Sequence, residues 1–309
     1  MVQKILLTGA TGYVGGTVLS TLLASKNTGI SALSISVLVR RRQQAHLLES
    51  KGVRVLMFAG FDDDGVIRQT AAEHDAERKK QLGSDVYYIH ISGTSSLADS
   101  PVLNLHTSHP KIPFSDRDPE RITTTLQSLE NDISYPQRTT DLKVLSLGEE
   151  LHVRTYILYL PILYGIGTGD FNTISGQIPA LMKATLRDGY TSVVGNGQGR
   201  KSHVHIEDVG SFCELILDQL LTNKPVPFGN KGVFFVTSGS QSYHDISKGI
   251  SKAAVELKVS RNEELVSLTI DEAVKKLGWS DSKMVIELGF VSRSVTYIQL
   301  GPDWPVKDF

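Results

Sequence analysis

Residues 8–16, TGATGYVGG, decide the fold class of this chain of 309 residues. They follow an apolar run at residues 4–8 (KILLT), which predicts a buried strand. A glycine turn between a strand and a helix is where dinucleotide-binding sheets hold a pyrophosphate. Gly9 would allow the sharp turn, Gly12 the approach of backbone to phosphate, and Gly15 the close packing of helix and strand. The spacing is GxxGxxG instead of the general GxGxxG, and a plain glycine-rich turn is the alternative.

Strand and helix patterns alternate through the first half of the chain. Strands are predicted at residues 4–8, 35–39, 53–58, 85–92 and 153–160, and helices at residues 43–51, 65–82 and 140–151. Alternation of this kind implies parallel strands with helices on both faces of the sheet. The sequence therefore predicts an α/β fold, with a Rossmann-type doubly wound parallel sheet in residues 1–164.

The second half of the chain has a different sequence pattern. Loops rich in Gly and Asn occur at residues 165–176 and 195–199. Helices are predicted at residues 178–187, 207–222 and 244–257. A further helix is predicted from Thr269, which has capping-box spacing with Glu272. We expect residues 165–309 to form a smaller C-terminal α+β lobe for the substrate, with part of the chain returning to the main sheet.

Composition excludes several classes of protein. The net charge is −1, so there is no overall basic field to hold nucleic acid or an anionic membrane. Cys213 is the only cysteine, which excludes a disulfide framework and a Cys-based zinc site. The most apolar stretch, residues 156–164, is interrupted by Pro161 and is too short for a membrane span. These features predict a cytoplasmic protein with a small-molecule substrate and no metal; a homo-oligomer remains open.

Three stretches together resemble one family. They are residues 8–16, residues 160–165 (LPILYG) and residues 203–209 (HVHIEDV). The chain thereby resembles the extended and atypical branches of the short-chain dehydrogenase/reductase superfamily, the NAD-dependent epimerase/dehydratase-like proteins, over about residues 1 to 220. The resemblance implies a nicotinamide dinucleotide cofactor. It implies a cofactor site that includes Thr11, Tyr13 and Val14 of the glycine loop, and Pro161 beside the nicotinamide.

The end of the second predicted strand bears on the choice of dinucleotide. An acidic residue there would bind the ribose hydroxyls of NAD, whereas a basic one accommodates the phosphate of NADP. The strand ends in Arg40 and Arg41, whose guanidinium groups suit phosphate oxygens. NADP(H) is therefore the favoured cofactor, and NAD(H) is the alternative. The arginines could instead be a solvated basic start to the next helix. Asp62, after the third strand, matches a position that the family uses near the adenine; an ordinary helix N-cap is equally consistent.

The catalytic pattern is incomplete. In the family, a Ser or Thr follows the strand that leads to the active site, and a Tyr and a Lys four residues apart lie on the next helix. Thr94 and Ser95 match the Ser/Thr element, and Tyr135 matches the general acid or base. Position 139 is Thr instead of Lys, and Arg138 lies one residue short of it. This departure puts ordinary reductase catalysis in doubt, and a structural role for Tyr135 is the alternative.

One strand–helix unit is missing relative to the family pattern. Residues 60–85 are long enough for a single crossover, yet the flanking strands resemble the third and the fifth of the family. We expect that a segment of roughly 20–30 residues is absent, with the junction near residues 75–80.

The sequence predicts an NAD(P)-dependent oxidoreductase acting on a small, aldehyde-type carbonyl or an alcohol, or related epimerase or dehydratase chemistry. The alternatives are a non-catalytic NAD(P)-binding regulatory protein and a truncated inactive variant.

Overall fold

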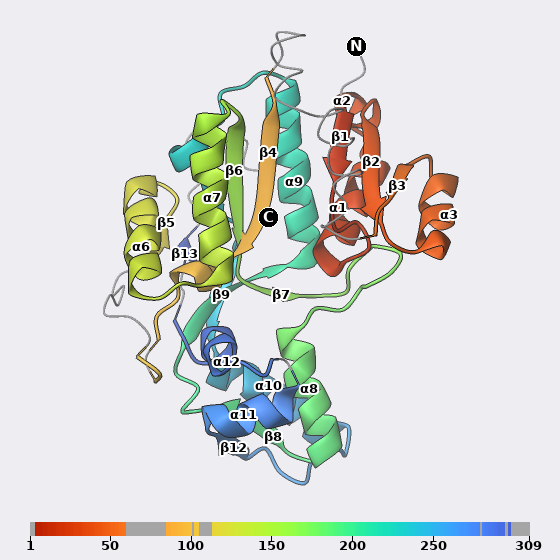
Figure 1. Ribbon diagram of the computed structural model, residues 1–309. Coiled ribbons are helices and arrows are strands. Elements are labelled where there is room, and N and C mark those ends of the chain that lie inside the picture. The colour runs from red at the N-terminus through yellow and green to blue at the C-terminus, as the bar shows by residue number, and fades with distance from the viewer. Residues whose placement is uncertain are drawn as a thin grey trace.

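The structure is a computed structural model. It describes residues 4–59, 85–100, 102–104, 113–278, 280–293 and 296–297. The described chain has the predicted α/β fold, in which parallel strands alternate with helices (Figure 1). The helix predicted at residues 65–82, the junction near residues 75–80 and Asp62 lie outside the described residues.

The first sheet is built from the N-terminal strands. Its members are β1 (Lys4–Leu7), β2 (Ser34–Val39) and β3 (Arg54–Met57), all parallel and in the order β1-β2-β3. They are connected through helices α1 (Tyr13–Ala24), α2 (Thr28–Ser31) and α3 (Arg42–Ser50). The strand positions follow from short apolar runs, and Gly52 in the left-handed conformation (φ +80°) comes just after α3.

The second sheet has the order β10-β6-β4. Its strands are β4 (Tyr87–Gly93), β6 (Arg154–Leu160) and β10 (Val233–Phe235). A 3-10 turn, Thr94–Leu97, follows β4, and helices α6 (Pro119–Asp132) and α7 (Pro136–Glu150) precede β6. Strand β4 pairs with β6 along its whole length, in parallel register from Tyr87 opposite Arg154 to Gly93 opposite Leu160. The short strands β5 (Phe114–Ser115) and β13 (Thr296–Tyr297) pair beside this sheet.

The two sheets are not hydrogen-bonded to each other within the described residues. In the usual strand order of such folds, 3-2-1-4-5-6, the first strand pairs with the fourth. Here β1 pairs only with β2, and β4 pairs only with β6, among the residues described. The sheets are instead joined by one hydrophobic core, which α1 and α9 (Ile206–Leu221) share with β2, β6 and β10. Figure 1 shows α9 between β1 and β4 in the view.

A smaller lobe lies at the carboxyl ends of these strands (Figure 1). It holds helices α8 (Gln177–Asp188), α10 (Tyr243–Glu256), α11 (Ile270–Leu277) and α12 (Lys283–Phe290), and the pair β8 (Thr191–Val194) and β12 (Leu265–Leu268). A third sheet, β11-β9-β7, uses β7 (Ile162–Tyr164), β9 (Arg200–His205) and β11 (Gly239–Ser242). A 3-10 turn spans Gly229–Lys231. The lobe has its own hydrophobic core.

Local capping signals account for several helix boundaries. The predicted capping box of Thr269 and Glu272 is present at the start of α11. Helix α7 begins at Pro136, four residues before the predicted start, because Pro is favoured at the first helical position. Helix α6 begins in the same way, with Asp118 as its N-cap and Pro119 next. Helix α6 is not among the helices predicted from the sequence.

No helix in the described part of the chain is long and apolar enough to cross a membrane.

Candidate active site

The glycine loop forms a tight turn before α1. Gly9 has φ +70°, and a Cβ at Gly15 would lie 2.3 Å from the Gly9 carbonyl oxygen. The N-cap of α1 is Gly12, which offers no side chain to the free amides, and the first turn of the helix carries no acidic residue. Exposed amide donors at a helix N-terminus bind anions. This cradle therefore fits the pyrophosphate of a dinucleotide.

The other predicted loop residues also hold the loop to its surroundings. The Tyr13 hydroxyl donates a hydrogen bond to the carbonyl oxygen of Gly165 at 2.8 Å, and the Thr11 carbonyl accepts one from the Asn172 amide at 3.4 Å. Both contacts join the loop to the segment that follows β7. Val14 lies on the first turn of α1 and lines a cavity described below.

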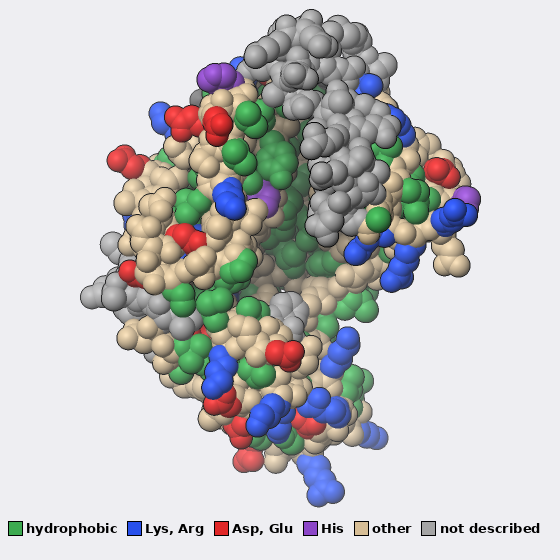
Figure 2. Space-filling view, in the orientation of Figure 1, with side chains coloured by type: hydrophobic (Ala, Val, Ile, Leu, Met, Phe, Trp, Pro, Cys, Tyr) green, Lys and Arg blue, Asp and Glu red, His purple; other side chains and the backbone are tan. Residues whose placement is uncertain are grey.

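The predicted phosphate-binding arginines follow β2. Arg40 and Arg41 are both exposed, and Arg41 is the N-cap residue of α3. Figure 2 shows Lys and Arg side chains gathered on the part of the molecule that carries β2, β3 and α3. The arginines are therefore available to a ligand at the carboxyl end of β2. Asp62 lies outside the described residues.

The structure brings two of the predicted catalytic residues together. The Tyr135 hydroxyl lies 3.4 Å from Ser95 Oγ, within hydrogen-bond distance. Ser95 lies in the 3-10 turn after β4, and Tyr135 is the N-cap residue of α7. Gln137 Nε2 donates to Ser95 Oγ at 3.0 Å and to the Gly93 carbonyl at 2.7 Å, which fixes the turn against α7. Thr94 is buried.

Arg138 does not reproduce the geometry of the absent lysine. Its guanidinium is fully buried, and Nε donates to the Ser96 carbonyl at 3.0 Å. The guanidinium carbon lies 5.7 Å from the centre of the Tyr135 ring, so the charge faces the ring. Burial lowers the pKa of Arg138, and Glu130, 3.9 Å away, opposes this shift. Thr139, where the family has Lys, hydrogen-bonds Glu130.

A cavity of about 400 Å³ lies between the glycine loop and these residues. Its lining comes from α1, β4, α7 and the β6–β7 corner: Val14, His90, Ile91, Ser92, Gly93, Gln137, Thr140, Leu160, Pro161 and Leu163. Val14 and Pro161, both predicted cofactor contacts, therefore share one cavity. Figure 2 shows a hollow with hydrophobic walls in this part of the molecule.

Sequence reasoning missed a buried polar network beside this cavity. Asp141 on α7 is fully buried, and its Oδ1 lies 3.2 Å from His90 Nε2. Its Oδ2 accepts hydrogen bonds from Ser96 Oγ at 2.7 Å and from the Tyr159 hydroxyl at 3.0 Å. A signal was present, because His90 is two residues before Ser92 on the strand that leads to the Ser/Thr element, and Asp141 lies six residues after Tyr135.

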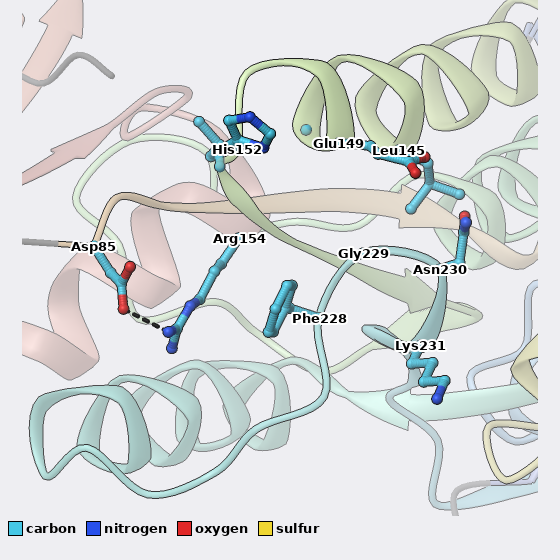
Figure 3. Close-up of a pocket in the computed structure, with 11 residues that line it drawn as sticks. Asp85, Leu145, Glu149, His152, Arg154, Phe228, Gly229, Asn230 and Lys231 are labelled. Carbon is cyan, nitrogen blue, oxygen red and sulfur yellow. Dashed lines mark ion pairs between the residues drawn. The ribbon is translucent and has the colours of Figure 1, made fainter. Parts of the chain in front are cut away.

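A second cavity, of about 540 Å³, lies at the opposite ends of the strands. Figure 3 shows Asp85 and Arg154 paired there, with Phe228 beside the guanidinium. The ion pair measures 2.6 Å, and Arg154 lies 5.2 Å from the centre of the Phe228 ring. Asp85 precedes β4 and Arg154 begins β6, so this cavity is at the amino ends. Ligands of open α/β sheets bind at the carboxyl ends, which favours the first cavity.

Within the residues that the structure describes, no three His, Cys, Asp or Glu side chains gather as a metal site would require.

Comparison with known proteins identifies the family. The model of the "NAD dependent epimerase/dehydratase family" matches residues 5–226, well over half of the chain. The chain belongs to this family. Membership supports NAD(H) binding and assigns NAD-dependent chemistry of the oxidoreductase, epimerase and dehydratase kind.

Two curated proteins are similar over most of their length. Oxidase ucsJ from an Acremonium species is 25% identical over 308 aligned positions, which cover 88% of this chain and 85% of that protein. Uncharacterized protein YLL056C of Saccharomyces cerevisiae is 22% identical over 329 positions, which cover 97% of this chain and 94% of that protein.

Two solved structures share the fold of this chain. The PbgP3 protein from Burkholderia pseudomallei has a TM-score of 0.56 at 10% identity and covers 91% of this chain and 92% of its own. A double mutant of DesIV, a dTDP-glucose 4,6-dehydratase from Streptomyces venezuelae solved with NAD bound, has a TM-score of 0.55 at 15% identity. The match covers 95% of this chain and 93% of that structure's chain. These likenesses confirm the predicted Rossmann-type α/β fold.

Proposed function

We propose that this protein is an NADP(H)-dependent oxidoreductase acting on a small carbonyl compound or alcohol, or on a substrate of the related epimerase and dehydratase reactions. The observation that carries the proposal is the 3.4 Å contact between Ser95 Oγ and the Tyr135 hydroxyl, at the carboxyl end of β4. This pair lies beside a cavity that Val14 and Pro161 line from the cofactor side. A similar protein named as an oxidase supports the redox assignment.

In this proposal each group has a separate task. The amides after Gly12 and the space left by Gly9 and Gly15 hold the pyrophosphate, because anions bind at such helix ends. Arg40 and Arg41 hold the ribose phosphate. When bound, the nicotinamide supplies or accepts the hydride. Thr11, Tyr13, Val14 and Pro161 complete the cofactor site, and Asp62 remains a proposed adenine contact.

The substrate oxygen is proposed to lie at the Ser/Thr element. Ser95 Oγ, or Thr94 Oγ1 after a small movement of its turn, holds that oxygen, while Tyr135 moves the proton. Arg138 keeps a positive charge on the ring face of Tyr135, which is a weaker aid to ionisation than a cation beside the hydroxyl. We therefore expect slower turnover than an intact Tyr-Lys pair would give.

Turnover with a panel of small aldehydes and ketones tests the enzyme proposal. NADPH oxidation is followed at one enzyme concentration for the wild type, Tyr135→Phe and a matched control, Tyr190→Phe. The control removes a phenol that hydrogen-bonds Lys276 in the lobe. The proposal predicts loss of about 100-fold or more in turnover for Tyr135→Phe and no change for the control. Unchanged turnover in Tyr135→Phe would remove Tyr135 from the reaction.

Calorimetric titration with NADPH and NADH tests the choice of cofactor. The double variant Arg40→Ser, Arg41→Ser should bind NADPH about tenfold or more weakly and leave NADH binding unchanged, because charge-assisted hydrogen bonds to the phosphate are lost. Arg187→Ser is the matched control, since Arg187 is exposed in the lobe and pairs with Asp188. Equal losses for both cofactors would contradict the preference for NADP(H).

A non-catalytic NAD(P)-binding role is the second candidate. Two observations favour it: the separation of β1 from β4 among the described strands, and Thr139 in place of the family's Lys. The alignment with YLL056C has 329 positions, whereas this chain has 309 residues, so at least 20 positions hold no residue of this chain. A difference of that size supports the absence of a strand–helix unit. Tight NADPH binding without turnover of any panel substrate would favour this role.

A further inference from the structure

We propose that His90, held by the buried carboxylate of Asp141, is a second proton-carrying group of the cavity of about 400 Å³, and that it returns a proton to Tyr135 after Tyr135 has given its own to the substrate. This inference rests on the proposed function and adds a residue to it. It gives the site a second proton-carrying group, in a chain that lacks the lysine of the family pattern at position 139.

His90 and Asp141 form a close pair. His90 Nε2 lies 3.2 Å from Asp141 Oδ1. Asp141 is fully buried, whereas the His90 side chain keeps 19% of its surface exposed and lines the cavity. A buried carboxylate that orients an exposed imidazole is the arrangement that acid–base catalysis by histidine uses.

The other oxygen of Asp141 is held by two hydroxyl groups. Oδ2 accepts hydrogen bonds from Ser96 Oγ and from the Tyr159 hydroxyl. Burial and the nearby carboxylate raise the pKa of Tyr159 well above its usual value, so its hydroxyl stays a donor. Within the described residues no other side chain or backbone amide donates to Oδ1, which faces His90 Nε2 at 3.2 Å. The carboxylate is therefore fixed in place with one oxygen directed to His90.

The position of the imidazole determines the direction in which the proton can move. With Nε2 turned to Asp141, the second ring nitrogen, Nδ1, is the one left for a molecule in the cavity. The same cavity is lined by Val14 and Pro161, the residues proposed to border the nicotinamide. A substrate placed there would meet His90 from the side of β4 and the cofactor from the side of α1.

Other charged and titratable groups around His90 have fixed partners. On its own strand, Tyr88 stacks on the imidazole with ring centres 6.3 Å apart. On α7, Arg138 donates to the Ser96 and Ile133 carbonyls, and Asp141 pairs as described. On β6, Tyr159 donates to Asp141. Among these described neighbours, Asp141 is the one that contacts an imidazole nitrogen.

Gln137 connects this pair to the residues predicted from the sequence. Its Nε2 donates to Ser95 Oγ at 3.0 Å and to Ser96 Oγ at 2.9 Å, and Ser96 in turn donates to Asp141. One polar network therefore runs from Tyr135 to His90. In carbonyl reduction the substrate carbon gains a hydride from the reduced nicotinamide dinucleotide, and its oxygen gains the proton of the Tyr135 hydroxyl. The His90 imidazolium then supplies the proton that restores Tyr135, and solvent returns a proton to the imidazole.

Kinetics of His90→Gln test the proposal, with His244→Gln on α10 as the matched control. We expect kcat of His90→Gln to fall about 100-fold or more, with KM and the Kd for NADPH within twofold of the wild type. The limb of the pH–rate profile that His90 carries should disappear. Unchanged kcat and an unchanged profile in His90→Gln would overturn the inference and leave the proposed function standing.

A second measurement does not depend on turnover. Nitrogen NMR of the imidazoles, with the His90 signals assigned from His90→Gln, reports which ring nitrogen carries the proton in the neutral form. We expect the Nε2–H tautomer of His90 in the wild type and a mixture of tautomers in Asp141→Asn. The Asp141→Asn variant also tests the pair if His90→Gln does not fold. A wild-type Nδ1–H tautomer would overturn the inference. Absence of turnover by the wild type with every panel substrate would overturn the proposed function and this inference together.

Discussion

The two three-stranded parallel sheets differ in what they bury. In the first, β1 and β3 are partly exposed, and residues 4–59 bury no charged side chain. In the second, six of the seven residues of β6 are buried, and the surroundings of that sheet and the lobe bury Asp99, Arg138, Asp141, Lys201 and Glu287. The first sheet offers a ligand its backbone and exposed arginines; the second offers oriented side chains.

In the proposed function this contrast separates binding from chemistry. Backbone amides and glycine turns hold a phosphate without titrating, so the first sheet should respond little to pH. Buried charges need partners and titrate as units, so the second region should carry the pH dependence. The shared core of α1 and α9 is what joins the two regions among the described residues.

The largest expected effect concerns Lys201 on β9. Burial lowers the pKa of Lys201 to about 7, and its Nζ donates to the Leu288 carbonyl. An unfolded lysine titrates near 10.4, so between pH 7 and 10 the unfolded state binds a proton that the native state does not. Stability should therefore rise with pH through this range, and the penalty below pH 7 reaches about 5 kcal/mol.

Lys201→Met is the variant that isolates this effect. It should unfold at a higher denaturant concentration than the wild type at pH 6, with the difference shrinking toward pH 10. The Leu288 carbonyl keeps a partner in the variant, because Ser292 Oγ also donates to it at 2.9 Å. Chemical denaturation at several pH values measures the difference. A constant difference across the range would mean that Lys201 is charged in the native protein.

The next effect is expected at Gly15 in the first sheet's loop. An added Cβ would meet the Gly9 carbonyl at 2.3 Å, so Gly15→Ala must displace the cradle. Overpacking of this kind costs about 1–3 kcal/mol, which corresponds to NADPH binding weaker by about 5- to 150-fold. Titration calorimetry measures it. Because no titrating group is involved, the loss should be equal at pH 6 and pH 9; a pH-dependent loss would break the contrast between the regions.

The smallest effect is expected where α1 meets α9. A Cβ at Gly210 would lie 2.4 Å from Thr21 Oγ1, whereas a Cβ at Gly249 on α10 meets nothing within 4 Å. Gly210→Ala should lower stability by about 1–2 kcal/mol, and Gly249→Ala should raise it by about 0.5–1 kcal/mol. Thermal unfolding compares the two. Stabilisation of both variants would show that the α1–α9 contact has space for an added methyl group.

Local signals predicted the first sheet better than the second region. The apolar runs and the glycine turn lie within 60 residues, so periodicity and spacing were sufficient for β1, α1, β2 and β3. Helix α6 was missed because its start carries only the Asp118–Pro119 signal, which also fits a loop. The His90–Asp141 pair was missed because its members are 51 positions apart, and only the packing of α7 on β4 brings them together. Arg138 was noticed one residue before the position of the absent lysine, but its burial could not be predicted from the sequence.

Hydrogen exchange with and without NADPH tests the central claim most directly, namely that a nucleotide-binding sheet and a chemistry-bearing sheet are joined through helices. We predict faster exchange in β1 and β3 than in β6 without ligand, because the former are more exposed. NADPH should slow exchange in peptides covering residues 5–24 and 36–45, with little change in β6. Uniform protection of both sheets, or no response of residues 5–24 to NADPH, would contradict the account.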